Sequence, residues 1–209
     1  MSTQIKMQAI IEAPYYQDEF ICPWKVSDFE PFSKIRLHPE ITIPEIGLVV
    51  AKLAQYNDIE LSNSKPAIIE QILEAKSLVL PGGIEVIDER EKSISPGCCC
   101  GLERWREWFN FLSTGNSPWL GHDPSPWLEM QGDMVSIWSD GLLESVRNAF
   151  CFEVSRSQLK EALKLVENDL QGFLFSLESW AQEIGVTNSK ELFRKFDDCF
   201  SIWHGFIKH

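Results

Sequence analysis

The sequence lacks both a hydrophobic run long enough to span a membrane and a secretory signal. Its most apolar stretch, Ile46–Ala51, ends at Lys52, whereas a spanning helix needs about 20 apolar residues. The first ten residues contain no basic segment followed by an apolar one, which is the pattern of a signal peptide. We therefore expect a soluble cytoplasmic protein without a membrane partner.

Positive charge is also scarce. The 209 residues include 19 Lys and Arg against 31 Asp and Glu, a net charge of −12. The densest basic stretch, Arg104–Arg106, lies between Glu103 and Glu107. Phosphate backbones repel such a surface, so we expect no nucleic-acid binding. The acidity suits a basic protein partner, or it serves only to keep the chain soluble.

The cysteines do not form the pattern of a disulfide framework. Three of the six are consecutive, and the other three are scattered singly at Cys22, Cys151 and Cys199. Disulfide-rich secreted domains have denser and more even spacing. We therefore expect reduced thiols.

The hydrophobic periodicity predicts one α+β domain, with a mixed part over 1–154 and a helical hairpin over 155–207. Residues 1–45 are irregular and punctuated by prolines. Turn signals at Gly132–Asp133 predict a hairpin of two strands. The predicted strands are Met7–Glu12, Glu19–Cys22, two short ones within Leu78–Ile87, Trp127–Gln131, Met134–Ser139 and Val146–Val154. The predicted helices are Pro44–Tyr56, Pro66–Lys76, one starting near Gly101, and the two helices of the hairpin.

The helical hairpin has the clearest signals. Ser155 and Ser157 are both candidate N-caps, and the spacing of Ser155 and Gln158 is that of a capping box. Apolar residues then recur at intervals of three and four up to Gly185, which predicts the end of the first helix. The second helix is predicted to run from Asn188 to about Phe206. The expected fold is a small antiparallel sheet covered by helices and ending in this C-terminal αα-hairpin.

Unusual residues concentrate between the cysteine triplet and Trp138. Five of the eight tryptophans fall in this stretch, together with a histidine beside an aspartate. If the chain has a binding site, this region is the first candidate. The candidate binding residues are Cys98, Cys99, Cys100, Trp119, His122, Asp123, Trp127 and Trp138.

Two roles are open for the cysteine triplet. Gly97 and Gly101 bracket it, and a helix beginning there would stabilise a thiolate through its dipole. Cys99 or Cys100 could then act as a nucleophile with His122 as its base. Alternatively, small apolar thiols simply fill a crowded turn, which is the commoner role of free cysteine. A zinc site is not expected, because structural zinc prefers cysteine pairs two to four residues apart, and no cofactor is expected.

The loop around His122 and the tryptophans beside it also allow two interpretations. Asp123 could orient the imidazole of His122, but Asp-Pro and Ser-Pro pairs are also strong turn formers that explain this composition by themselves. Trp119 and Trp127 lie in this polar loop, where exposed aromatic residues commonly anchor a partner or ligand.

Two segments, Pro96–Trp108 and Pro118–Trp127, resemble a group of uncharacterised bacterial proteins that are known mainly as predicted sequences. The stretch Asp169–Phe173 is similar as well. The resemblance implies a bacterial cytosolic protein and assigns no activity, cofactor or site residue.

Two functions are compatible with these patterns. The first is a non-enzymatic protein-binding module that neutralises or regulates a basic protein, as bacterial immunity proteins do. The alternative is a ligand-binding protein or cysteine-dependent enzyme that uses the region Cys98–Asp123. The sequence contains no phosphate-binding loop, nucleophile elbow or HExxH motif, so no catalytic residue is assigned.

Overall fold

The computed structural model describes residues 3–15, 21–141 and 149–203, and all structural statements refer to these residues. The fold is α+β, as predicted, with antiparallel sheets and five α helices. The strands are β1 Ile5–Glu12, β2 Lys34–Arg36, β3 Gly82–Asp88, β4 Ser93–Ile94, β5 Trp127–Gln131, β6 Met134–Trp138 and β7 Cys151–Ser155. The helices are α1 Ile43–Tyr56, α2 Lys65–Glu74, the 3-10 turn η1 Leu102–Arg104, α3 Glu107–Thr114, α4 Arg156–Glu183 and α5 Ser189–Phe200.

The strands form two sheets that meet at the N-terminus. One has the order β2-β1-β3-β4 and the other β5-β6-β7. The backbone N–H of Thr3, just before β1, donates to the carbonyl of Glu153 in β7 at 2.7 Å. The start of β1 therefore touches the second sheet, while its end pairs with β2.

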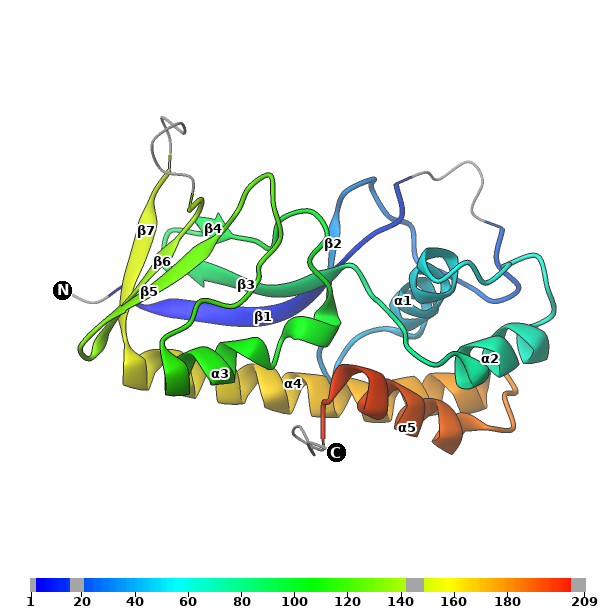
Figure 1. The fold of residues 1–209 in the computed structure, drawn as a ribbon. Coiled ribbons are helices and arrows are strands. Elements are labelled where there is room, and N and C mark those ends of the chain that lie inside the picture. Colours follow the sequence, from blue (N-terminus) through cyan, green and yellow to red (C-terminus); the bar gives the residue numbers. More distant parts are fainter. Residues whose placement is uncertain (1–2, 16–20, 142–148, 204–209) are drawn as a thin grey trace.

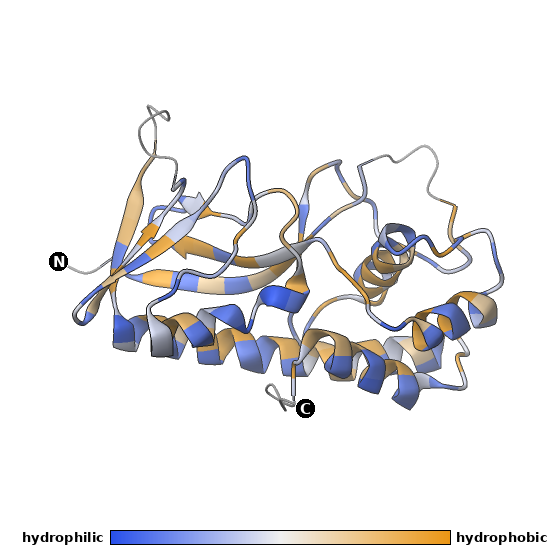
Figure 2. Cartoon of the chain, viewed as in Figure 1, coloured by the Kyte–Doolittle hydropathy of each residue, from blue (hydrophilic) through white to orange (hydrophobic). Residues whose placement is uncertain are grey.

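Helix α4 runs along the length of the molecule (Figure 1). It runs beneath both sheets, with α3 beside its N-terminal half and α5 packed against its C-terminal half. Helices α1 and α2 complete the end near α5, and α1 contacts α4 while α2 contacts α5. Hydrophobic residues gather along α1, the central strands and the side of α4 that faces them (Figure 2). No helix in the described ranges is both long and apolar enough to cross a bilayer.

The hairpin prediction is confirmed for residues 155–200. Ser155 caps α4: its Oγ accepts from the N–H of Gln158 at 3.1 Å, and the Gln158 side chain accepts from the N–H of Ser155 at 2.9 Å. The stripe from Leu159 to Ala181 is buried. Gly172 allows close packing, because a Cβ there would lie 2.3 Å from the Cγ of Pro39.

Other boundaries differ from the prediction. The segment Leu78–Ile87 contains one strand instead of two. This strand, β3, begins at Gly82, which pairs with Ile11 of β1 instead of making a hairpin turn. The helix predicted near Gly101 is the short turn η1 followed by α3. The strand predicted at Glu19–Cys22 is absent at Ile21 and Cys22, and its first two residues lie outside the described ranges.

Strand β7 and helix α5 are both shorter than predicted within the described residues. The strand predicted over Val146–Val154 is β7, which begins at Cys151, and residues 146–148 lie outside the described part. Helix α5 ends at Phe200, six residues before the predicted end, and Ser201 has a left-handed backbone (φ 50°). Residues 204–209 are not described.

Candidate functional site

Two loops that are distant in the sequence meet at the cysteine triplet. The N–H of Cys98 donates to the carbonyl of His122 at 2.7 Å, and the N–H of His122 donates back to Cys98 at 3.0 Å. Gly97 makes this approach possible, because a Cβ there would lie 2.0 Å from the carbonyl oxygen of Pro124. Gly121 has φ 93°, and a Cβ there would lie 2.4 Å from the carbonyl oxygen of Gly97. The two loops therefore touch backbone to backbone and hold Cys98 beside His122.

The first two thiols of the triplet lie on the same side of the chain. In an extended segment neighbouring side chains point to opposite sides, so Cys98 and Cys100 would have been the pair to converge. Cys99 instead has a left-handed backbone (φ 64°), which reverses the chain locally. Its Sγ lies 3.5 Å from the Sγ of Cys98. These two sulfurs and a ring nitrogen of His122 all lie within 4.8 Å of one another.

Asp123 holds the imidazole of His122. Its carboxylate lies 3.0 Å from Nδ1 of His122, so Nε2 is the ring nitrogen left to face another group. Asp123 itself has a left-handed backbone (φ 52°) and is followed by a cis peptide bond to Pro124. The side chain of His122 is 46% exposed and that of Asp123 is 89% exposed. The two neighbours therefore converge, as the first interpretation of this loop requires.

The cluster separates the pKa values of the two exposed thiols. The hydrogen bond with Cys98, and then that with His122, holds the pKa of Cys99 below the ordinary value of a thiol. The same sulfur–sulfur contact raises the pKa of Cys98. The hydrogen bond with Asp123, followed by that with Cys99, raises the pKa of His122. As the pH rises, Cys99 is therefore the first of the two thiols to become a thiolate.

Cys100 has a different environment. It is buried, and its Sγ lies 3.8 Å from the carbonyl oxygen of Trp119. Burial, followed by the charge of Glu103, raises its pKa to about 12. Cys100 therefore packs as a small apolar residue and is unsuited to act as a nucleophile, in contrast to the sequence hypothesis that included it.

Glu12, Tyr15 and Tyr56 interact electrostatically with the cluster, and Lys52 lies beside the two tyrosines. Lys52 of α1 is 2% exposed, and its Nζ lies 4.4 Å from the ring centroid of Tyr15 and 5.9 Å from that of Tyr56. The hydroxyl of Tyr15 donates to Glu12 at 2.8 Å. Burial, then the hydrogen bond with Glu12, raises the pKa of Tyr15 to about 12, with a smaller contribution from Cys98. Burial, then the charge of Cys99, raises the pKa of Tyr56.

Sequence reasoning missed these surrounding residues. A signal was nevertheless present, because Lys52 ends the most apolar stretch of the chain and lies four residues before Tyr56 on the same helix. That spacing puts both side chains on one face. Burial lowers the pKa of Lys52, so this lysine is held in the protein interior beside the tyrosines. Glu12 and Tyr15 lie in or near the predicted strand Met7–Glu12 and gave no signal of their own.

The remaining predicted site residues are the three tryptophans Trp119, Trp127 and Trp138. Trp119 is 46% exposed and Trp127 is 51% exposed. Trp127 pairs directly with Trp138 across strands β5 and β6, and Trp138 is half-buried. Side chains of directly paired residues lie on the same face of a sheet. Trp127 and Trp138 therefore lie on the same, outer face of the second sheet.

The donors of the cluster are suited to a soft or borderline metal ion. Sulfur and imidazole ligands are those of zinc sites, and ligating histidines usually donate their second ring N–H to a carboxylate. Cys98, Cys99 and His122 could hold such an ion, with Asp123 behind the histidine. The expectation of no metal site relied on the sequence spacing of cysteines, and the convergence of Cys98 with Cys99 depends on a backbone turn that spacing does not reveal. Comparisons of the chain with protein-family models, curated proteins and solved structures found no match.

Proposed function

We propose that the protein binds a divalent metal ion of the zinc class through Cys98, Cys99 and His122. The observation that supports this proposal is the convergence of the three donor atoms within 4.8 Å. Ligands around one tetrahedral ion stand at comparable separations, because metal–sulfur and metal–nitrogen bonds are about 2.0–2.3 Å long. The backbone bonds between Cys98 and His122 hold two of the donors together before any ion arrives.

The number of protein ligands favours a metal ion with an open coordination position over a purely structural one. Three protein ligands are typical of catalytic zinc sites, which keep a fourth position for water or substrate, whereas structural sites have four. Two thiolates and one neutral imidazole also balance the charge of a divalent ion. We infer that the fourth position takes a small donor molecule.

Metal titration tests the proposal directly. The purified chain is stripped with a chelator and titrated with zinc against a competing indicator, and cobalt substitution is followed by thiolate-to-metal charge-transfer absorption. We expect one ion per chain and a charge-transfer band. Cys98→Ser, Cys99→Ser and His122→Asn should each weaken zinc binding at least about tenfold, since each removes a ligand.

Matched controls identify adventitious binding. Cys151→Ser and His38→Asn change the same residue types outside the cluster and should leave zinc affinity unchanged. Equal zinc affinity in the cluster variants and in the controls would contradict the proposal. Rapid alkylation of Cys99 in a chain that binds no zinc would instead favour the cysteine-nucleophile hypothesis.

A second candidate function is binding of a basic protein partner. The exposed Trp119 and Trp127, with Trp138 on the same face as Trp127, support it, because exposed tryptophans are frequent anchors at interfaces. The net charge of −12 adds attraction for a basic surface.

This second candidate is tested by co-purification from the native cells at low salt. The chain is compared with a double variant, Trp119→Ser with Trp127→Ser. A basic protein that the wild type retains and the double variant loses supports the candidate. Recovery of the same proteins by both chains contradicts it.

A further inference from the structure

The N-terminal half of β1 is paired on one edge only. Strand β3 pairs with β1 along Ile5–Ile11, whereas β2 pairs on the opposite edge only with Ile10–Glu12. The carbonyl of Ala9 accepts from Leu37 N–H, just beyond β2, at 2.9 Å. The edge that carries β2 is therefore occupied from Ala9 onward.

The open part of this edge lies before Ala9. Main-chain groups alternate between the two edges of a strand, so those of Ile5 and Met7 point to the same edge as those of Ala9. At the far end Thr3 bonds to Glu153 of β7. Between these two contacts, Ile5 and Met7 have no neighbouring strand within the described part of the chain.

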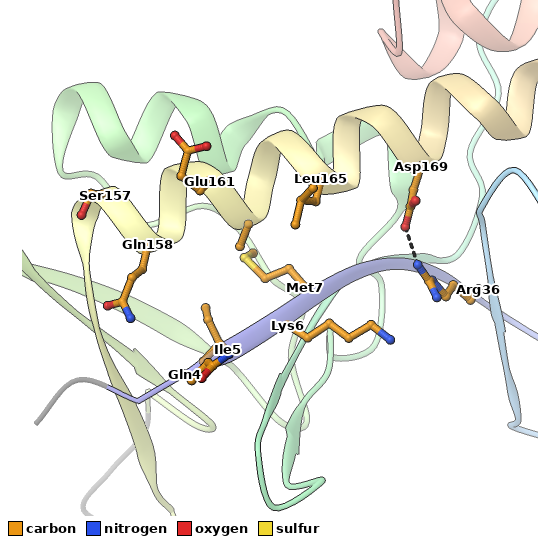
Figure 3. Close-up of a pocket in the computed structure, with 11 residues that line it drawn as sticks. Gln4, Ile5, Lys6, Met7, Arg36, Ser157, Gln158, Glu161, Leu165 and Asp169 are labelled. Atoms are coloured by element: carbon orange, nitrogen blue, oxygen red, sulfur yellow. Dashed lines mark hydrogen bonds and ion pairs between the residues drawn. The ribbon is translucent and has the colours of Figure 1, made fainter.

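This open edge forms one wall of a cleft of about 730 Å³, whose other wall is α4. Figure 3 shows Met7 reaching from β1 toward the helix and Leu165 projecting from the helix over the same space. Leu165 is 65% exposed, although it is a large apolar side chain. An ion pair between Arg36 and Asp169, with an N–O distance of 2.5 Å, closes one end. The cleft thus offers main-chain hydrogen-bonding groups next to an apolar surface.

We propose that this cleft binds an extended segment of a partner protein, which adds to β1 as a strand. Ile5 and Met7 would each exchange main-chain hydrogen bonds with the segment, as in other complexes where a peptide extends a sheet. Alternate side chains of the segment would face Met7 and Leu165 and should be apolar. The side chains between them would face away from the helix, beside Lys6.

The shape of the edge argues against a second copy of this chain as the occupant. The open residues are recessed between β7 and β2, which both contact the same edge of β1. Two recessed edges cannot approach each other, whereas a single extended segment can enter. Two copies would also each carry a charge of −12, which opposes their association.

The site is distinct from the cysteine cluster. Glu12 and Tyr15, the residues near the cluster, lie at or beyond the C-terminal end of β1, and the cleft lies at its N-terminal half. The inference is therefore independent of the proposed metal site. All binding measurements are made with a chelator present, so that failure of one proposal leaves the other intact.

The test uses a display library of linear peptides about six residues long, the usual length of a strand. Selection is for binding to the described chain, and enriched peptides are synthesised and titrated while backbone amide signals are recorded by NMR. We expect enriched sequences in which apolar residues occupy every second position. Their addition should shift the amide signals of Ile5 and Met7 and the methyl signals of Leu165.

Two variants with matched controls decide the mode of binding. Ile5→Pro removes an N–H that faces the open edge and leaves the bonds to β3 in place, and Ile5→Val keeps that N–H. Leu165→Ser removes the apolar surface, and Phe175→Ser makes the same kind of change at another exposed position of α4. Ile5→Pro and Leu165→Ser should each weaken peptide binding at least tenfold, and the two controls should leave it within twofold of wild type.

Circular dichroism and thermal unfolding show whether each variant is folded. A folded Ile5→Pro or Leu165→Ser that binds the peptides as tightly as wild type would overturn the proposal. Failure to enrich any peptide whose binding depends on Leu165, or a dimer that buries the Ile5 and Met7 amides, would do the same.

Discussion

The helical hairpin α4–α5 and the paired cysteine and histidine loops are built in opposite ways. The hairpin follows local rules: a capping box at Ser155, a buried apolar stripe and a glycine after the first helix. The loops break local rules, with left-handed backbones at Cys99 and Asp123 and a glycine, Gly97, pressed against another backbone. Strained backbone of this kind persists where the surroundings hold it and is common at functional sites.

From this contrast we expect the hairpin to contribute mainly to the stability of the fold and the two loops mainly to the proposed zinc site. Among the described residues, the α4 stripe is buried and apolar, whereas Cys98 and Cys99 are exposed. Substitutions in the hairpin should therefore change the free energy of unfolding without changing zinc binding by the folded chain. Substitutions of the exposed cluster side chains should do the reverse.

The largest expected effect is that of Phe173→Ala in α4. Phe173 is fully buried, with its ring centroid 6.2 Å from that of Phe196 in α5. Loss of this ring leaves a cavity and should lower the free energy of unfolding by about 3–5 kcal/mol, as measured by urea denaturation. Leu165→Ala on the exposed side of the same helix should change it by about 0.5 kcal/mol or less. A weakened zinc affinity in folded Phe173→Ala would break the separation between the two regions.

Gly97→Ala should affect both stability and the cluster. Its Cβ would lie 2.0 Å from the carbonyl oxygen of Pro124 and 2.6 Å from that of His122, so the two loops must separate. We expect a loss of about 1–3 kcal/mol in unfolding free energy, typical of overpacking, together with loss of zinc binding in the indicator assay.

Gly115→Ala is the control for this change. Gly115 has φ 75°, and a Cβ there meets nothing within 4 Å, so only the backbone cost of about 1 kcal/mol applies. It should retain full zinc binding. If Gly97→Ala also retained full zinc binding, the contact between the loops would not be what assembles the cluster.

Ser155→Ala should have a smaller effect, confined to the hairpin. It removes the oxygen that accepts from Gln158 N–H, and loss of such a cap costs about 1 kcal/mol. The sequence offered Ser157 as an equal candidate, but its Oγ is hydrogen-bonded to the Oγ of Ser155, at 2.9 Å, and Ser155 is the residue that accepts from Gln158 N–H. Ser157→Ala should therefore be milder in thermal unfolding, and the opposite ranking would assign the cap to Ser157.

These regions also differ in how far the sequence predicts them. The hairpin could be predicted because its signals, such as Ser155 with Gln158, lie within a few residues of one another. The pairing of Cys98 with His122 joins positions 24 residues apart, and no periodic pattern sets that register. The prediction of two short strands around Pro81-Gly82-Gly83 was wrong for the same reason, because the pairing partner of Gly82 lies far away in the sequence. This segment has the composition of a turn, but Gly82 is needed where a Cβ would lie 2.2 Å from the carbonyl oxygen of Ile10.

The smallest expected effect on stability, and the sharpest test of the site, is Asp123→Asn. Asp123 is 89% exposed and lies behind His122, with an oxygen 3.0 Å from Nδ1. Asparagine keeps the size of the side chain but removes the charge that supports the ligand nitrogen. We expect an unchanged urea midpoint and a zinc affinity about tenfold weaker, since the carboxylate behind a ligating histidine contributes about 10–100-fold to affinity. Asp133→Asn, in the turn between β5 and β6 and away from the cluster, is the matched control and should bind zinc like the wild type. An Asp123→Asn variant that binds zinc equally well would show that the charge of Asp123 does not support His122 as a ligand.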